Sequence, residues 1–424
     1  MHDLRMLRDQ IEVLRDAVRR RGAADALLPV LERGEALDRE RRALITAVEE
    51  QKAERNATSQ EVARRKRAKE DAEALIARGR AMGEAIAAGE AKLGEVETAL
   101  QQLLLDVPNV PLADVPAGGE EHNVIVKTWG TPRESTGIRP HWDVMAAFGM
   151  FDQERAAKVS GSGFVVYRGR GARLVRALVS LFMDTHAAEH GYHEVWPPQL
   201  VTRASMTGTG QLPKFEDDAY ATRGDDLFLI PTAEVPVTNL YRDEMLDGAQ
   251  LPMAFVAYSR CFRREAGSAG KDTRGILRTH EFDKVELVRY AAQDDSEAQL
   301  ELLTRHAETM LERLELPYRR KLLAAGDTGF SSAKTYDLEA FAPGVGAWLE
   351  VSSCSTFADF QARRANIRYR PAPGEKPRFV HTLNGSGLAV PRTIACLLEH
   401  HQQADGSVAI PAALQPYLGT DRLA

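Results

Sequence analysis

The chain has 424 residues, of which 44% are hydrophobic and 27% are charged, an ordinary composition for a soluble protein of two or three domains. Its formal net charge of −6 excludes nucleic-acid binding that rests on overall charge, so such a partner would need a local basic patch. Three widely separated cysteines, Cys261, Cys354 and Cys396, argue against a disulfide framework or a cysteine zinc cluster.

The N-terminus and the hydropathy of the chain bear on its location. The first ten residues, "MHDLRMLRDQ", are charged from the third position and lack the apolar region of a secretory signal. No segment approaches the roughly 18 apolar residues that a membrane-spanning helix requires. We therefore expect a soluble, cytoplasmic protein with no membrane partner.

Residues 1–105 are predicted to form a helical arm, because helix-forming Ala, Glu, Arg and Leu dominate there. Apolar residues recur at seven-residue steps, which is typical of a coiled coil. They are Leu75, Met82, Val96 and Leu103, then Ile86, Leu93 and Leu100, and in the preceding helix Val30, Leu37 and Leu44. We expect an antiparallel hairpin roughly 50 Å long, with its tip near the basic stretch "RRKRAKEDAE". From the pattern alone, a dimerisation or spacer coiled coil is the simpler interpretation.

A linker is predicted at residues 106–125, where Pro108, Pro111 and Pro116 end the helix. Residues 126–424 then mix helices with strands. A helix is expected within residues 172–192, and strands within residues 193–201, 228–241, 253–265, 278–290 and 348–357. Neighbouring strands are joined by hairpins rather than by crossover helices. This predicts an α+β domain with an antiparallel sheet flanked by helices.

A hairpin in the middle of the chain combines basic and acidic residues. It spans residues 261–287, its turn carries Gly267, Gly270 and Gly275, and its cations include Arg263, Arg264, Lys271, Arg274 and Arg278. Because strand side chains alternate, Arg263 and Glu265 should share a face, as should Phe282, Lys284 and Glu286. Arginine grips phosphate, an aromatic ring stacks on a base, and a carboxylate suits an amine or hydroxyl. The hairpin could hold a nucleoside triphosphate beside an amino acid, although a solvated hairpin with ion pairs explains these residues equally well.

The common nucleotide-binding loops, G-x-G-x-x-G and G-x-x-x-x-G-K-[ST], are absent from the sequence. Three other stretches resemble, in the expected order, the signature motifs of class II aminoacyl-tRNA synthetases. They are "GARLVRALVSLFMDTHAAEHGYHEVWPPQLV", "FRREAGSAGKDTRG" and "NGSGLAVPRTIACLLE". The stretches "PTAEVPVTNL" and "WLEVSSCSTFADFQARRANIRYR", and the long helical arm, are similar to the bacterial seryl-tRNA synthetases. The resemblance covers essentially the whole chain.

The resemblance implies an ATP-dependent serine–tRNA ligase. Such an enzyme activates L-serine to seryl-adenylate and transfers it to the 3′ end of tRNA(Ser), and we extend this expectation to tRNA(Sec). The family further implies Mg²⁺ bound with ATP and a homodimer whose interface includes the helix at residues 173–192. No Cys/His cluster has the spacing of a catalytic zinc site, so we expect no zinc.

Residue roles are implied by the same resemblance. The catalytic residues are Arg263, Glu265 and Arg392. Serine is expected to contact Thr232, Ala233, Glu234, Glu286 and Ser386. ATP is expected to contact Arg263, Arg264, Glu265, Thr279, Phe282, Glu350, Val351, Ser352, Ser353 and Arg392, with Mg²⁺ at Glu350 and Ser353. The arm is expected to bind tRNA through Arg64, Arg65, Arg67 and Lys69.

Two other functions are alternatives to a synthetase, and the sequence departs from the family pattern at Pro391 and at His2, where an apolar residue is more usual. A ligase that charges a carrier protein would be expected to lack the long arm. A catalytically silent RNA-binding relative would be expected to have lost one of Arg263, Glu265, Glu286 or Arg392, and all four are present. Pro391 stands where glycine is more usual before Arg392, which could shift that arginine.

Overall fold

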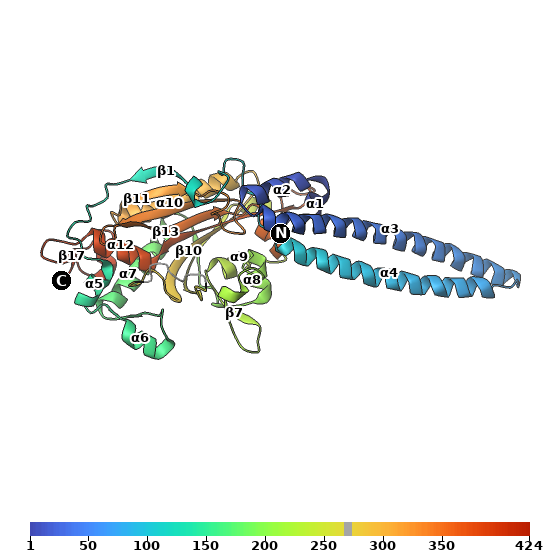
Figure 1. Cartoon of the computed structure of the whole chain (residues 1–424), viewed down its shortest axis with the longest axis horizontal. Coiled ribbons are helices and arrows are strands. Elements are labelled where there is room, and N and C mark those ends of the chain that lie inside the picture. The colour runs from blue at the N-terminus through green and yellow to red at the C-terminus, as the bar shows by residue number, and fades with distance from the viewer. Residues whose placement is uncertain (267–273) are drawn as a thin grey trace. The chain divides into compact units, whose positions relative to one another are not determined.

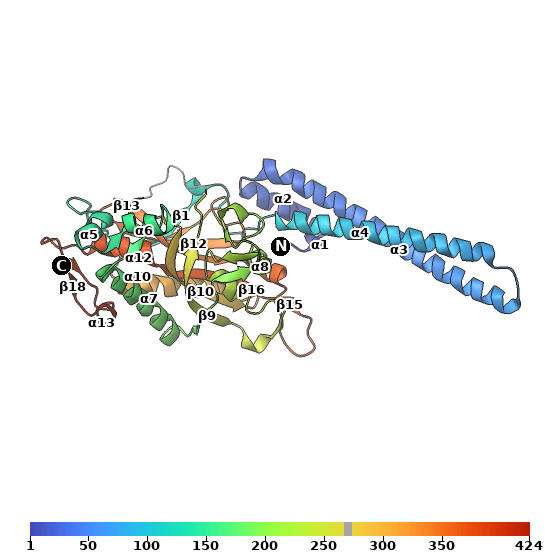
Figure 2. The same ribbon diagram turned by 90° about the horizontal axis from the view of Figure 1, so that it is seen from below.

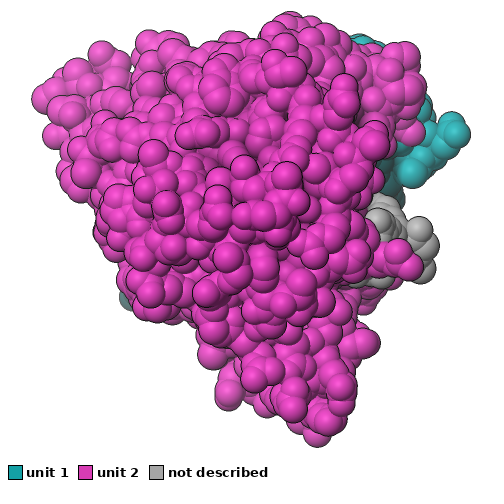
Figure 3. Space-filling model, turned by 90° about the vertical axis from the view of Figure 1, so that its left-hand side faces the viewer, with its two compact units in different colours: residues 1–19, 23–108 teal, residues 20–22, 109–424 magenta. Residues whose placement is uncertain are grey.

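The computed structural model describes residues 1–266 and 274–424 and divides into two compact units. One unit comprises residues 1–19 and 23–108, and the other comprises residues 20–22 and 109–424 (Figure 3). Gly267, Gly270 and Lys271, which the sequence places in the turn of the central hairpin, lie outside the described residues.

The first unit is helical. It contains α1 (Leu4–Asp9), most of α2 (Ile11–Arg20), α3 (Ala24–Ala68) and α4 (Glu73–Leu105). Helices α3 and α4 lie side by side and run in opposite directions as a long hairpin (Figures 1 and 2). Although α3 runs over 45 residues, no helix within the described ranges is both long and apolar enough to cross a bilayer.

The heptad pattern predicted for the long helices is confirmed. Ile86 and Val96 of α4 are buried, whereas most positions between them are exposed. Gly89 interrupts the apolar series because a Cβ there would lie 2.8 Å from Cγ2 of Val48, so the two helices approach closely at this point. The hairpin turns at the predicted tip, where Lys69 ends α3 in the left-handed conformation with a φ of 57°.

The second unit is built on an eight-stranded sheet. In spatial order its strands are β1 (Val124–Trp129), β11 (Tyr318–Leu322), β12 (Lys334–Ala342), β13 (Ala347–Thr356), β16 (His381–Ala389), β10 (Glu281–Ala291), β9 (Met253–Phe262) and β4 (His193–Val195). Neighbours in this described sheet are antiparallel, except that β4 and β9 are parallel. The predicted α+β class with an antiparallel sheet is confirmed.

Different helices cover the two faces of this sheet. They are α7 (Arg170–Ala188), α10 (Ser296–Arg313) and α12 (Val390–His400) on one face, and α9 (Glu234–Thr238) and α11 (Phe360–Ala365) on the other. Leu287 of β10 packs in the core of the first group, and the next residue, Val288, packs in the core of the second. Because side chains alternate along a strand, Lys284 and Glu286 lie on the same face as Val288.

Smaller elements surround the sheet. They are α5 (His141–Ala147), β2 (Phe151–Asp152), α6 (Gln153–Ser160), β3 (Val166–Tyr167), β5 (Leu200–Thr202), α8 (Arg203–Thr209), β6 (Tyr220–Ala221), β7 (Leu227–Leu229), β8 (Met245–Asp247), β14 (Arg368–Arg370), β15 (Arg378–Phe379), β17 (Val408–Ala409), α13 (Gln415–Leu418) and β18 (Arg422–Leu423). Three short 3₁₀ turns, at Glu120–His122, Glu216–Asp218 and Gly248–Gln250, complete the described elements.

One predicted strand is wrong. Residues 228–241 were expected to be extended, but β7 ends at Leu229 and α9 begins at Glu234. Pro236 lies in the first turn of α9, where a missing backbone N–H costs no helical hydrogen bond. The hydroxyl oxygen of Thr232 accepts the backbone N–H of Glu234 at 3.3 Å, which satisfies one donor of that first turn.

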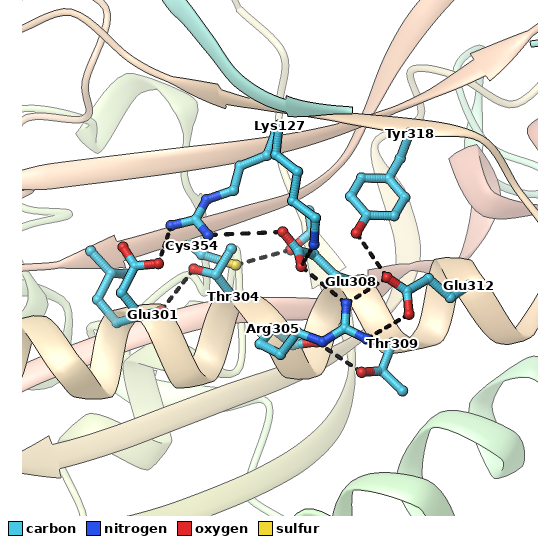
Figure 4. A network of polar contacts seen from close by, with 12 residues as sticks. Lys127, Glu301, Thr304, Arg305, Glu308, Thr309, Glu312, Tyr318 and Cys354 are labelled. Atoms are coloured by element: carbon cyan, nitrogen blue, oxygen red, sulfur yellow. Dashed lines mark hydrogen bonds and ion pairs between the residues drawn. The ribbon is translucent and has the colours of Figure 1, made fainter. Parts of the chain in front are cut away.

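A buried ionic network fixes the edge strand β1 to helix α10 (Figure 4). The Glu308 side chain is only 1% exposed, and its Oε2 accepts from Nζ of Lys127 at 2.5 Å and from Nη1 of Arg305 at 3.2 Å. Nearby, the hydroxyl of Tyr318 donates to Glu312 Oε1 at 2.9 Å. A buried carboxylate must be paired to be tolerated, so Lys127 is expected to hold β1 against the rest of the sheet.

Candidate active site

A cavity of about 520 Å³ opens on the face of the sheet that carries Lys284 and Glu286. All but three of the residues predicted to bind serine or ATP line it: Thr232, Glu234, Arg263, Glu265, Thr279, Phe282, Glu286, Glu350, Val351, Ser353, Ser386 and Arg392. These residues come from distant parts of the sequence, and the second unit brings them around one space.

Three predicted contacts are not in the lining of the cavity. Ala233 is fully buried in the core beside α9. The backbone N–H of Arg264 donates to the carbonyl oxygen of Asp218 at 3.0 Å. The hydroxyl of Ser352 donates to the backbone oxygen of Ser386 at 2.7 Å, so this side chain holds β13 to β16.

Arg263 and Phe282 form one wall of the cavity. The Arg263 guanidinium lies over the Phe282 ring, 5.2 Å from its centroid, and Nε donates to the carbonyl oxygen of Pro231 at 3.4 Å. Strand alternation was expected to put Arg263 and Glu265 on one face. That reason is wrong, because β9 ends at Phe262 and neither residue lies in a strand. Glu265 instead reaches the cavity through a left-handed backbone with a φ of 53°.

Arg278 was named only among the cations of the hairpin, yet it also lines the cavity. Its Nη1 donates to Oε2 of Glu265 at 3.1 Å, which joins the two sides of the hairpin near its turn. Thr279 beside it is buried, and its hydroxyl donates to the backbone oxygen of Glu281 at 2.9 Å. The proton of the Thr279 hydroxyl is thus used inside the hairpin.

The cavity also contains a buried carboxylate with several polar contacts. Glu286 is 1% exposed and forms an ion pair with Lys284. Nδ2 of Asn384 donates to Glu286 Oε1 at 3.0 Å, and Nζ of Lys284 donates to the hydroxyl of Thr232 at 2.8 Å. The pocket thereby offers a cation, a carboxylate and a hydroxyl, groups that suit a small zwitterion.

Glu234 is the second buried carboxylate of this pocket. Its Oε1 accepts from Nε2 of Gln361 at 2.6 Å. Burial, together with the neighbouring Glu286 carboxylate, raises the pKa of Glu234 to about 7. Near neutral pH the Glu234 carboxyl is therefore divided between its protonated and ionised forms, and the ionised form is the one that suits accepting hydrogen bonds from a cationic ligand.

Sequence reasoning left Lys284, Asn384 and Gln361 out of the predicted site. The strand period gave a signal for two of them, because Lys284 alternates with Glu286 on β10 and Asn384 lies two residues before Ser386 on β16. Gln361 gave no such signal, since it is 127 residues from Glu234 in the sequence and meets it only through the fold.

Arg392 contributes a second guanidinium from the first turn of α12. Its Nη1 donates to the backbone oxygen of Glu350 at 2.8 Å and lies 3.5 Å from Glu350 Oε2. Pro391 occupies the first turn of the same helix, a position where proline is favoured because no helical hydrogen bond is lost. Pro391 is thus accommodated in the helix, and Arg392 lines the cavity.

The oxygens near Arg392 suit a hard cation. Glu350 supplies a carboxylate and Ser353 a hydroxyl, the donor chemistry that Mg²⁺ prefers when ATP supplies further oxygens. Behind them lies Asp337, paired with Ser353 across β12 and β13. Burial, with the Glu350 carboxylate next in effect, raises the pKa of Asp337 well above its usual range. Among the described residues no group of three or more His, Cys, Asp or Glu is placed to hold a metal ion by itself, and the expectation of no zinc stays a prediction.

The predicted tRNA contacts lie at the tip of the arm in the first unit. Arg64 and Arg65 both donate to Glu61, through Nη2 at 2.7 Å and Nε at 3.0 Å respectively. These two hydrogen bonds, that from Arg64 first, lower the pKa of Glu61 to about 2. Arg67 and Lys69 are exposed, so the tip presents basic groups to solvent.

Comparisons with known proteins match both units. Residues 1–111 match the family described as the seryl-tRNA synthetase N-terminal domain, and residues 214–401 match the class II tRNA synthetase core domain (G, H, P, S and T). The chain is 67% identical to the serine–tRNA ligase of Gemmatimonas aurantiaca over 425 residues, covering 100% of both chains.

Solved structures agree with the sequence matches. A seryl-tRNA synthetase from Pyrococcus horikoshii, complexed with ATP, is 36% identical with a TM-score of 0.94, over 100% of this chain and 99% of that one. A cytoplasmic serine–tRNA ligase from Naegleria fowleri, in complex with AMP, is 28% identical with a TM-score of 0.89, over 100% of this chain and 98% of that one.

Proposed function

The chain belongs to the seryl-tRNA synthetase family, and from this premise we propose that it uses ATP to join L-serine to the 3′ end of tRNA(Ser). The observation that carries the proposal is the buried set Thr232, Lys284 and Glu286, which lines the same cavity as Arg263 and Arg392. A small zwitterion and a phosphate chain fit the two ends of such a cavity. By the same chemistry we extend the proposal to tRNA(Sec).

ATP binds at the arginine end. Arg263 holds the α-phosphate and lies over one face of the Phe282 ring, so adenine stacks on the other face. Arg392 binds the far phosphates from the first turn of α12, and Glu265 with the Thr279 backbone orients the nucleotide. A Mg²⁺ ion held by Glu350 and Ser353 would supply positive charge against the phosphates when bound.

Serine binds at the carboxylate end. Thr232 and Glu234 accept from its ammonium group, and Glu286 with Ser386 bonds its hydroxyl. A site built to bond a hydroxyl rejects alanine strongly, because buried polar groups would lose their partner. Threonine offers the same hydroxyl, so its extra methyl group must be excluded by the shape of the pocket.

The reaction proceeds in two steps by positioning and electrostatics. The serine carboxylate attacks the α-phosphorus in line, pyrophosphate leaves, and Arg263 stabilises the charge that develops. The ribose hydroxyl of the terminal adenosine of tRNA then attacks the carbonyl of seryl-adenylate and displaces AMP. The tip of the arm binds the tRNA backbone through Arg64, Arg65, Arg67 and Lys69, and the enzyme acts in the cytoplasm, where its product is used.

The test is ATP–pyrophosphate exchange with each amino acid in turn. Exchange that requires serine, with alanine and threonine far weaker, supports the proposal. Exchange supported equally by alanine would contradict the role given to Glu286 and Ser386, and exchange with no dependence on any amino acid would contradict the function.

The enzyme is further proposed to be a homodimer. The edge strand β1 exposes Val124, Ile125, Val126 and Trp129, each by 36% or more, while pairing with β11 on one side. Exposed apolar residues along an edge strand favour a protein partner, and a second copy of the chain is the simplest one. The exposed side of α7, which the family places in the interface, is more polar and includes Arg173 and Asp184.

We expect sedimentation at micromolar concentration to give twice the 46.8 kDa mass of the chain. Val126→Asp should increase the monomer fraction, because a charge would be buried at the interface. Val159→Asp is the matched control, since Val159 on α6 is 80% exposed and lies outside β1. A fully active wild-type monomer would contradict the dimer.

A further inference from the structure

Gln361 lies behind the serine pocket and bonds two residues that line the cavity, Glu234 and Thr209. It is fully buried in α11 and is not part of the lining of the cavity. Its Nε2 donates to Glu234 Oε1 at 2.6 Å and to the backbone oxygen of Thr209 at 3.1 Å. Its Oε1 accepts from the hydroxyl of Thr382 at 2.7 Å.

These contacts allow only one orientation of the Gln361 amide. Thr209 offers a carbonyl oxygen, which can only accept, and Glu234 in its ionised form offers only acceptors. Turning the amide over would place its oxygen against both of them and its NH₂ group against the Thr382 hydroxyl. The amide is therefore locked with an N–H pointing at the Glu234 carboxylate.

We propose that Gln361 is a positioning residue that orients the Glu234 carboxylate and favours its ionised form for the ammonium group of serine. This inference rests on the proposed function and deepens it, because it concerns how the serine site is prepared rather than which groups touch serine. A glutamine suits the role because its amide donates to the carboxylate and carries no charge that would compete for the ligand's ammonium group.

Several charged and polar groups besides Gln361 affect the ionisation of Glu234. Glu286 of β10 opposes ionisation of Glu234, while Lys284 of β10 and Arg263 after β9 favour it. Helices α8 and α11 contribute the Thr209 carbonyl and the Gln361 amide. Burial and Glu286 raise the pKa of Glu234 to about 7, and the hydrogen bond from Gln361 works in the opposite direction. Removing that bond should raise the pKa further.

The test is Gln361→Met, which keeps the length of the side chain and removes the donor. At pH 7 the KM for serine in pyrophosphate exchange should rise about tenfold or more, since a hydrogen bond to a charged group is lost. The KM for ATP should stay within about twofold of the wild type. In plots of kcat/KM for serine, the acidic limb should move to higher pH, so the defect should shrink between pH 7 and about 8.5.

An unchanged KM for serine would overturn the inference, and so would a loss that is the same at every pH, because a purely structural role would not respond to titration. Thr382→Val removes the hydroxyl that orients the amide, and it should show a smaller defect in the same direction. If Gln361→Met fails to fold, the pH profile of Thr382→Val decides.

Gln299→Met is the matched control, since Gln299 is a similarly buried glutamine on α10 that bonds Asp295. Its KM for serine and its pH profile should follow the wild type. Serine-dependent exchange by the wild-type enzyme separates the two claims. If the wild-type enzyme shows no serine-dependent exchange, the proposed function is wrong. If the wild-type enzyme is active and the Gln361 and Thr382 variants match it, only the role given to Gln361 is wrong.

Discussion

Replacing Arg263 with alanine should lower serine-dependent pyrophosphate exchange by about 100-fold or more. In the proposed geometry this guanidinium meets the charge that develops on the α-phosphate, and losing one such preorganised donor typically costs on the order of 3 kcal/mol. The Arg263 side chain also packs over Phe282 and bonds the Pro231 carbonyl oxygen, so it is already held in place before ATP arrives.

Lysine should restore only part of this rate, because a point charge cannot reproduce the planar fork of a guanidinium. Arg260→Ala is the control, since Arg260 lies on β9 shortly before Arg263, pairs with Glu281 and is not part of the lining of the cavity. It should keep near wild-type exchange. Near-normal exchange by both Arg263 variants would rule out the phosphate-binding role.

Shortening the arm should abolish efficient tRNA charging and leave serine activation nearly unchanged. The reason is that the activation site is contained in residues of the second unit, whereas the basic tip belongs to the first. Val48 and Gly89 approach closely across the hairpin, so residues 49–88 can be replaced by a short turn. This deletion keeps the base of the arm, where Leu7 and Leu103 pack against Gly34.

The two half-reactions should be measured on one preparation of the shortened protein. A milder variant, with Arg64, Arg65, Arg67 and Lys69 changed to glutamine, should weaken tRNA binding and reduce its dependence on salt. If the arm is only a structural coiled coil, activation and charging will fall together or survive together. Equal loss in both would defeat the tRNA-binding interpretation.

Much of the fold could be predicted because its signals are local. The heptad steps predicted a coiled-coil hairpin, and burial of Ile86 and Val96 agrees. The period of two predicted that Lys284 and Glu286 share a face. Residues 228–241 were mispredicted because their apolar pattern suits a strand, while the hydroxyl of Thr232 and the placement of Pro236 allow a short helix.

The site could be predicted only in part. The matched stretches of sequence identify residues expected to touch the substrates, but they do not identify the residues that position them. Glu234 and Glu286 came from recognisable stretches of sequence. The strand period pointed to Asn384, whereas Gln361 became visible only when the fold placed it against Glu234. The hydrogen bond between Gln361 and Glu234 joins positions far apart in the chain, so a local periodic pattern cannot predict it.

The central claim, that this chain is a serine–tRNA ligase, is tested most directly by charging. The purified full-length chain should be incubated with ATP, Mg²⁺, unfractionated bacterial tRNA and each labelled amino acid in turn, and the label on tRNA measured. We predict that serine accumulates on tRNA in an ATP-dependent manner and that the other amino acids do not. A folded preparation that charges a different amino acid, or charges none, would contradict the account.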